Sequence, residues 1–220
     1  MTDNDRLYIQ RLLGKKLIKG PVLELGGGYG GETCKQLIIA SELEYYTTDV
    51  LLSSGVDYVA NFESSNILDH FPADIRFKTV LILNVLEHTF DPIRVLDNAS
   101  KLLCGGGSLV VITPCLWPLH DYPIDCYRIL PNFYETFAHS RRMHLDKEHF
   151  EYLGYGTIAS NMNERFEYRF PLPCNGPTYW TSRLIHRLFN TYGRGMYAPG
   201  HVAIGAVLMK EEKPHRRCDE

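Results

Sequence analysis

Short apolar runs alternate along the chain with segments whose apolar residues recur every three or four positions. The short runs predict buried strands, and the three-to-four spacing predicts amphipathic helices. The expected strands cover residues 21–26, 44–50, 56–62, 77–88, 108–114, 155–161 and 201–210. The expected helices cover residues 4–18, 33–41, 92–103, two segments within 131–153, and 178–193.

This alternation predicts an α/β fold with an open, doubly wound, mostly parallel sheet, because helices connect successive parallel strands. We expect a single domain over residues 1–220, with a helical insertion or lid at 170–200 before the last strand. Ligands of such sheets bind beyond the carboxyl ends of the strands. The candidate site residues are therefore those that directly follow each strand.

Composition narrows the function classes. Hydrophobic residues make up 45% of the chain and charged residues 22%, as in ordinary globular proteins. The net charge of -3, with no Lys/Arg run longer than two residues, argues against a nucleic-acid partner. No apolar stretch is long enough to cross a bilayer, and the first residues show no signal-peptide core, so we expect a cytoplasmic protein.

Cysteine and histidine spacing predicts no metal site. The six cysteines form no C-x-x-C pair, and the nine histidines show no H-E-x-x-H or similar spacing. We expect reduced, mostly buried thiols.

The segment PVLELGGGYGGETC runs from an apolar strand into a turn with five glycines. Gly26, Gly28 and Gly31 fit G-x-G-x-x-G, the dinucleotide fingerprint. Glu24, with Gly26, Gly28 and Gly30, fits a second pattern, E-x-G-x-G-x-G. Either turn lets the backbone approach a nucleotide-like ligand, so the glycines alone leave the cofactor open.

Two carboxylates accompany this turn. Glu24 stands within an apolar strand, where a charge is costly unless it is used. A carboxylate there suits a ligand with a sulfonium and an ammonium group, whereas a dinucleotide fingerprint usually has an apolar residue. Asp49 ends the next expected strand and can accept both hydroxyls of a ribose, a geometry that both kinds of cofactor share.

The stretch ILNVLEHTFDPIRVLDNASKLLCGGGSLVVITP (82–114) resembles class I S-adenosylmethionine (SAM) methyltransferases that act on small molecules. Their fourth strand typically runs into an LEH turn, then D-P, then a helix that closes on a glycine-rich turn. With Asp49 and the E-x-G-x-G-x-G turn, the resemblance covers about residues 20–130. It implies SAM as the cofactor.

The resemblance also implies further cofactor contacts. Asn61 stands where the family usually has Asp, and its carbonyl oxygen can meet the adenine amine. Phe62 can offer a backbone N–H and an apolar face, and Asn84 is expected at the methionine end of SAM.

The segment PLHDYPIDCYRILPNFYETF follows the fifth strand and is rich in polar and aromatic residues. Methyl transfer is a direct displacement that needs alignment, exclusion of water and often a base. His120 and His88 are the candidate bases, because a histidine can take a proton near neutral pH. Asp125 either orients His120 or pairs with Arg128.

Tyr122, Tyr127 and Arg128 are the candidate substrate-binding residues. Similar H-x-x-P-x-D-x-[YW]-R segments occur in a subset of these methyltransferases associated with glycan or capsule biosynthesis. The resemblance therefore implies O-methylation of a sugar or of a capsule or natural-product precursor. The alternatives are an NAD-dependent oxidoreductase and a non-catalytic SAM-fold subunit that binds a partner protein, and a homodimer stays open.

Overall fold

The structure is a computed structural model that describes residues 2–28, 33–120, 124–155, 180, 184 and 201–212. The helices in these ranges are α1 (Asp3–Gly14), α2 (Lys35–Ala40), α3 (Pro92–Leu102) and α4 (Pro131–Ser140), with short 3-10 helices η1 (Ile67–His70), η2 (Leu86–His88) and η3 (Lys147–His149). The strands are β1 (Val22–Leu25), β2 (Tyr45–Asp49), β3 (Tyr58–Val59), β4 (Phe77–Leu83), β5 (Leu103–Leu116), β6 (Met143–Leu145), β7 (Glu151–Tyr155) and β8 (His201–Lys210).

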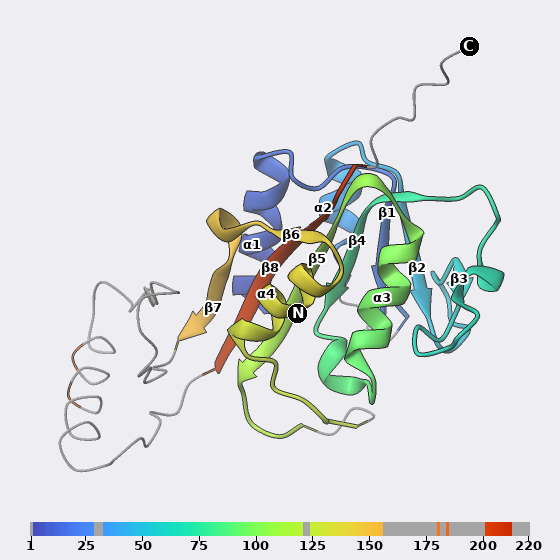
Figure 1. The fold of residues 1–220 in the computed structure, drawn as a ribbon. Coiled ribbons are helices and arrows are strands. Elements are labelled where there is room, and N and C mark those ends of the chain that lie inside the picture. The colour runs from blue at the N-terminus through green and yellow to red at the C-terminus, as the bar shows by residue number, and fades with distance from the viewer. Residues whose placement is uncertain are drawn as a thin grey trace.

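The described strands form one sheet in the order β3-β2-β1-β4-β5-β8, with β6 and β7 paired along the outer edge of β8 (Figure 1). The pairs among β1 to β5 are parallel. The last strand, β8, runs antiparallel to β5. The predicted mostly parallel, doubly wound sheet is thus confirmed, and its one reversed central strand is the strand expected at 201–210.

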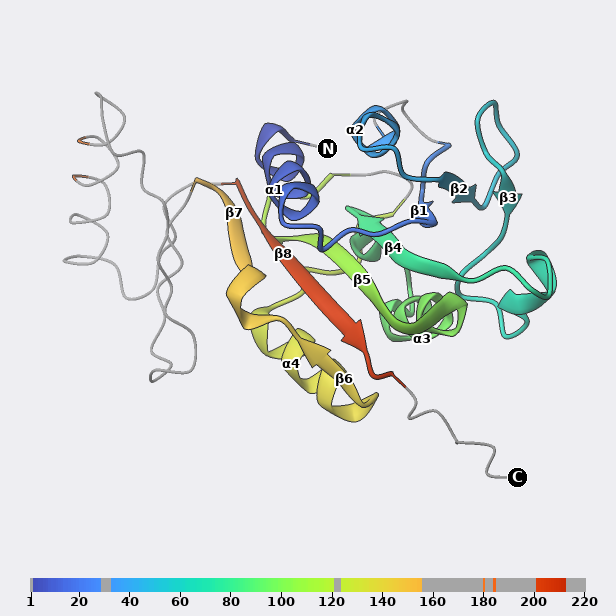
Figure 2. The same cartoon turned by 90° about the horizontal axis from the view of Figure 1, so that it is seen from above.

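Helices cover both faces of the sheet. Figure 2 shows α1 and α2 on one face, and α3 and α4 on the other. Because side chains alternate along a strand, neighbouring residues of β4 enter different cores. Val80 and Ile82 pack with α3, whereas Leu81 packs with α1. This explains why residues 80–83 of the run FKTVLIL are apolar at consecutive positions.

The ring of Tyr8 anchors α1 to the sheet, because it fills the space next to Gly205 in β8. Tyr8 is fully buried, and its hydroxyl donates to the carbonyl of His149 at 2.7 Å. A Cβ at Gly205 would lie only 2.7 Å from the Tyr8 ring. The N-terminus of the same helix is closed by a capping box between Thr2 and Asp5.

The prediction of one helix is wrong. The second helix within 131–153 is replaced by η3 and β7. Asp146 accepts hydrogen bonds from the N–H groups of Glu148 and His149, which holds the turn at η3. The following residues then pair with the open edge of β8, and this ladder outweighs the helical spacing.

Further differences concern boundaries, and the strand expected at 77–88 ends at Leu83. The strand expected at 56–62 is only Tyr58–Val59. The glycines at 105–107 lie within β5 rather than in a turn before it, because both Leu103 and Ser108 pair with β4 and the residues between them bulge. The expected strand at 155–161, helix at 178–193 and insertion at 170–200 lie outside the described residues, apart from Tyr155, Trp180 and Leu184.

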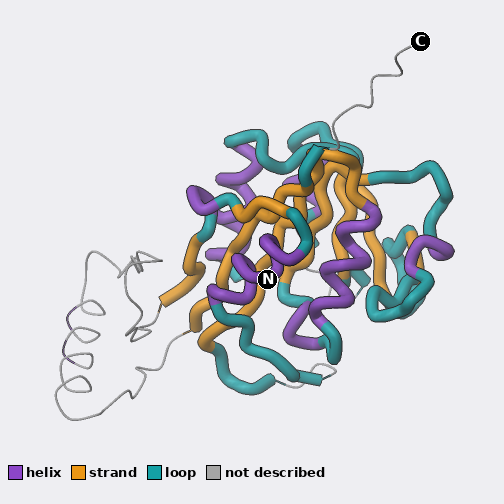
Figure 3. Tube along the Cα trace, viewed as in Figure 1, coloured by secondary structure: helices purple, strands orange, loops and turns teal. Residues whose placement is uncertain are grey.

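Figure 3 shows the long loop that follows β5 on its way to α4, at the carboxyl edge of the parallel strands. Within the described ranges, no helix combines the length and apolar character that a membrane crossing requires.

Candidate functional site

The glycine turn lies against the end of β2. Gly26 adopts a left-handed conformation (φ 76°), and a Cβ there would lie 3.1 Å from Val85. Gly28 donates its N–H to Oδ2 of Asp49 at 3.1 Å. A Cβ at Gly28 would come within 2.6 Å of the Ser53 hydroxyl. A side chain at either of these positions would be crowded by its neighbours, so glycine is needed at both. The turn therefore brings backbone without side chains next to Asp49.

Glu24 is buried beneath this turn, with 4% of its surface exposed. Its Oε2 accepts hydrogen bonds from the Cys34 N–H (3.0 Å) and the Tyr45 hydroxyl (2.8 Å). Burial raises the pKa of Glu24 to about 7. Glu24 thus ties β1 to the segment that begins α2. Its contact with a cofactor stays a prediction.

Asp49 ends β2 as predicted. Besides the bond from Gly28, its Oδ1 accepts the Leu51 N–H at 3.1 Å. Val50, Leu51 and Leu52 follow it with 60%, 64% and 80% of their surfaces exposed. A hydrogen-bonding carboxylate and an apolar surface therefore lie next to each other at this strand end.

Asn61 and Phe62 follow β3. The Asn61 Oδ1 accepts the Glu63 N–H at 2.9 Å. The ring of Phe62 is buried in the core beside Phe71, and its carbonyl accepts a hydrogen bond from Asn98. The predicted apolar face of Phe62 is therefore used by the core, and the contact of its backbone N–H with a cofactor stays a prediction.

Asn84 follows β4 in a left-handed conformation (φ 54°), with its N–H bonded to the Ile112 carbonyl at 2.8 Å. Its Nδ2 donates to Oδ2 of Asp5 at 3.2 Å. The other Asp5 oxygen is buried without a hydrogen-bond partner among the described residues. Sequence reasoning missed Asp5, because only the fold brings the first turn of α1 to the end of β4.

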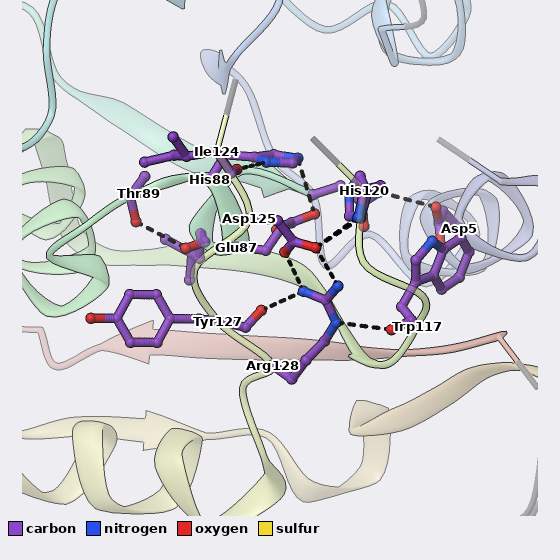
Figure 4. Close-up of polar contacts among 12 residues, drawn as sticks. Asp5, Glu87, His88, Thr89, Trp117, His120, Ile124, Asp125, Tyr127 and Arg128 are labelled. Atoms are coloured by element: carbon purple, nitrogen blue, oxygen red, sulfur yellow. Dashed lines mark hydrogen bonds and ion pairs between the residues drawn. The ribbon is translucent and has the colours of Figure 1, made fainter. Parts of the chain in front are cut away.

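Asp125 closes the loop after β5 (Figure 4). Both of its oxygens bind the Arg128 guanidinium, and Oδ2 also accepts the His120 N–H at 2.9 Å. Arg128 donates in addition to the carbonyls of Trp117 (3.3 Å) and Pro118 (2.9 Å). This guanidinium holds the pKa of Asp125 well below its usual range. Both alternatives raised for Asp125 are present, since it pairs with Arg128 and holds His120.

His88 and His120 lie together, with ring centroids 5.0 Å apart. His88 Nδ1 donates to the Ile124 carbonyl at 2.6 Å, because a carbonyl can only accept. This bond leaves the lone pair on Nε2 of His88, which lies 3.8 Å from Oε1 of Glu87. The two predicted bases thus come from separate loops to one place.

Glu87 completes this cluster. Its side chain is 2% exposed, and Oε2 has no hydrogen-bond partner among the described residues. Burial raises the pKa of Glu87 to about 8. The sequence analysis did not select Glu87, although a carboxylate between Leu86 and His88 in a buried turn could have indicated it.

The substrate candidates differ in their surroundings. The Tyr127 hydroxyl donates to the Phe90 carbonyl at 2.9 Å, and the side chain is partly exposed. Arg128 is committed to Asp125 and to loop carbonyls, so its role in this structure is to close the loop. Tyr122 and Gly30 lie outside the described residues. Large apolar side chains near these residues in the chain are exposed, namely Phe90, Leu119, Ile124 and Leu130.

A separate surface pocket of about 410 Å³ lies between α3 and the loop after β3, with Ser64, Asp91 and Lys101 among its lining. None of its lining residues is a predicted site residue, so we assign it no function.

A model of the methyltransferase-domain family matches residues 5–194 of the chain. The chain belongs to this family. It is a class I SAM-dependent methyltransferase domain, which sets aside the NAD-dependent alternative. The expected cofactor, SAM, is confirmed at the level of the family. No curated protein matches the chain.

Solved structures share the fold. A SAM-dependent methyltransferase from Archaeoglobus fulgidus is 15% identical, with a TM-score of 0.52 over 93% of this chain and 94% of that one. A putative methyltransferase from Bacillus halodurans is 14% identical, with a TM-score of 0.57 over 92% and 98%. The N-methyltransferase NodS from Bradyrhizobium japonicum, solved with S-adenosyl-L-homocysteine, is 11% identical, with a TM-score of 0.51 over 96% and 88%. These identities show a common fold and leave the acceptor open.

Proposed function

We propose that this methyltransferase methylates a hydroxyl group of a small molecule, namely a sugar or a capsule or natural-product precursor. The observation that carries the proposal is the cluster of Glu87, His88 and His120 at the ends of β4 and β5. A hydroxyl keeps its proton at neutral pH, so its methylation benefits from a positioned proton acceptor. The cluster supplies two imidazoles that can accept this proton, those of His88 and His120, at the edge where ligands of this fold bind.

The cofactor is proposed to bind along the ends of β1, β2 and β4. The proposed residues are Glu24, Gly26, Gly28, Gly30, Asp49, Asn61, Phe62 and Asn84. The described residues fit SAM: the turn is bare backbone where a Cβ would collide, and Asp49 offers a carboxylate beside an exposed apolar surface. SAM supplies an electrophilic methyl group on a positively charged sulfur.

The loop after β5 positions the acceptor side. Asp125, held by Arg128, fixes the backbone of His120. The Ile124 carbonyl fixes the ring of His88, so that Nε2 is the nitrogen able to take a proton. When the acceptor oxygen bonds to the methyl carbon, the bond from that carbon to sulfur would break and S-adenosylhomocysteine would leave, while the acceptor's proton would pass to an imidazole nitrogen of the cluster.

The acceptor class rests on the aromatic and polar character of the same loop. Tyr127 presents a partly exposed ring, and Tyr122 belongs to the same segment. Aromatic faces pack well against the apolar faces of sugar rings, while neighbouring polar groups bind the hydroxyls. This supports a sugar or a similarly hydroxylated ring over an aliphatic acceptor.

A transfer assay with methyl-labelled SAM tests the proposal. The full chain is incubated with free sugars, sugar nucleotides and primary amines, and the products are identified by mass spectrometry. We expect label on a hydroxyl oxygen and a large loss of turnover in His120→Ala, with SAM affinity retained. His144→Ala, an exposed histidine of β6, is the matched control. Label found on amines alone, or full turnover in both His120→Ala and His88→Ala, would contradict it.

A further inference from the structure

We propose that Glu87, His88 and His120 bind one divalent transition-metal ion of the Zn²⁺ type, with a coordination position left open for an oxygen of the acceptor. The role given to the open position rests on the proposed function, whereas the binding of the metal does not. The sequence analysis expected no metal, because these three residues do not form a recognisable spacing in the chain.

The three side chains converge from two loops. One ligand atom from each lies within 4.8 Å of the others, and Figure 4 shows the three side chains close together. Tetrahedral ligands of zinc lie roughly 3.4 Å apart when each is about 2.1 Å from the ion. Nε2 of His88 and Oε1 of Glu87 are already 3.8 Å apart. Small side-chain rotations would therefore complete the geometry.

Nε2 of His88 keeps its lone pair and is the ring nitrogen that can bind a metal. A histidine that ligates a metal usually donates its other ring N–H to a carbonyl or carboxylate, which fixes the ring and its tautomer. His88 makes this bond from Nδ1 to the Ile124 carbonyl. The Nδ1 atom of His120 lies 3.3 Å from Oδ2 of Asp125, which offers the second histidine a similar partner.

Glu87 provides an independent observation. A buried carboxylate oxygen without a partner is costly, and native structures rarely leave one. The side chain of Glu87 is 2% exposed, and its Oε2 has no hydrogen-bond partner among the described residues. A cation held by both carboxylate oxygens would satisfy Oε2, with Oε1 as the oxygen nearer to His88.

The surrounding charges also favour a cation. Arg128 acts on Glu87 as a cation, and the Asp125 and Asp5 carboxylates act against it. Both terminal nitrogens of Arg128 are bound to Asp125. The cluster is thus surrounded by one neutralised ion pair and a further carboxylate, which leaves net negative charge for an incoming ion.

The ligand set indicates which metal. Two imidazoles with one carboxylate suit zinc and other transition metals, whereas magnesium and calcium prefer oxygen ligands. Three protein ligands leave a position that catalytic zinc sites give to water or substrate. An acceptor hydroxyl bound there would become more acidic and lose its proton to a water molecule before its oxygen attacks the methyl group. With the metal bound, the imidazole nitrogens would be ligands, and the metal would replace them as the group that activates the hydroxyl.

Metal binding is measured directly on the full chain without SAM. The chelator-treated protein is titrated with Zn²⁺ by calorimetry, and with Co²⁺ by visible absorption, which reports nitrogen ligands. We expect one site per chain with micromolar or tighter affinity. We expect His120→Ala and Glu87→Gln each to weaken it at least about tenfold. His144→Ala is the control that keeps the wild-type affinity. Because His120 lies on a partly exposed loop, its variant folds even if Glu87→Gln does not.

Absence of saturable binding would overturn the proposal, and so would wild-type affinity in both His120→Ala and Glu87→Gln. The two proposals fail separately. Metal binding without methylation of any hydroxyl would refute the proposed function and leave the metal site standing. Hydroxyl methylation that persists in chelator-treated protein that binds no Zn²⁺ would support the function and refute the metal site.

Discussion

The carboxylate of Asp125 is bound by both terminal nitrogens of Arg128, and its Oδ2 also accepts the N–H of His120. The side chain of Asp125 is only 1% exposed, whereas that of Arg128 is 23% exposed. This pair determines where the backbone of His120 lies. It therefore links the rigidity of the loop to the position of a proposed reactive group.

Arg128→Met should loosen this loop. The substitution leaves the Asp125 charge without its partner, so we expect about 2 kcal/mol of lost stability, between the values of exposed and fully buried pairs. Turnover should fall while the Kd of SAM stays unchanged, since the cofactor residues lie on other strand ends. Chemical denaturation, turnover and calorimetry measure the three quantities.

Arg141→Met is the matched control. Arg141 forms a similar two-bond pair with Asp97 on the surface, away from the cluster. We expect it to leave turnover unchanged. Equal turnover in Arg128→Met and Arg141→Met would show that the Asp125 pair does not position His120.

Gly28→Ala should weaken SAM binding. The new Cβ would collide with the Ser53 hydroxyl at 2.6 Å and with Val56 at 2.8 Å, and it would crowd Asp49. Relief of this overpacking displaces the turn from Asp49, so we expect a loss of affinity of about tenfold. Gly14→Ala, where nothing lies within 4 Å, should bind SAM as the wild type does. Unchanged affinity in Gly28→Ala would remove the turn from the cofactor site.

Glu24→Gln should change how stability depends on pH. The pKa of Glu24 is raised to about 7 in the folded state, so the folded protein holds a proton that the unfolded chain releases. Stability of the wild type should therefore fall as pH rises from about 4.5 to 7, by up to about 3 kcal/mol relative to Glu24→Gln. Glutamine keeps an oxygen for the Cys34 and Tyr45 donors and does not titrate.

Urea denaturation at several pH values measures this difference. Glu42→Gln, an exposed glutamate, should give a curve parallel to that of the wild type. If Glu24→Gln also runs parallel to the wild type, Glu24 is not held in a desolvated position.

Gly205→Ala should destabilise the junction between α1 and the sheet. Its Cβ would lie 2.7 Å from the buried Tyr8 ring, and overpacking of this kind costs about 1–3 kcal/mol. Thermal unfolding measures the loss. The same substitution in a Tyr8→Leu background should cost less, because the colliding ring is gone. If Gly205→Ala lowers stability equally in both backgrounds, its destabilising effect does not come from a collision with the Tyr8 ring.

The sheet could be predicted from the sequence because its strands are buried on both faces. Runs such as VLIL in β4 and LVVI in β5 are apolar at consecutive positions and have no competing helical pattern. The helix expected near 146–153 was wrong for the opposite reason. Its spacing is compatible with a helix, and only the open edge of β8, distant in sequence, makes Glu151–Tyr155 a strand.

The positions of Asp49 at the end of β2 and of Asn84 directly after β4 could be predicted from the sequence, whereas their roles in binding stay predictions. Its networks were not predictable, because they join distant segments. Asp5 reaches Asn84 from the first helix, and Glu87 meets His120 across the loop after β5. No local pattern records such contacts, since they arise from the packing of α1 and from the closure of the loop by Asp125.

A calorimetric titration of the full chain with SAM, S-adenosylhomocysteine and NAD tests the central claim most directly, with Asp49→Asn as the variant and Asp69→Asn as its exposed control. We expect micromolar binding of the two sulfur nucleosides and no binding of NAD. Asp49→Asn should lose affinity by about tenfold or more, because hydrogen bonds to a charged group are lost, and Asp69→Asn should match the wild type. Binding of NAD alone, or undiminished SAM affinity in Asp49→Asn, would contradict this account.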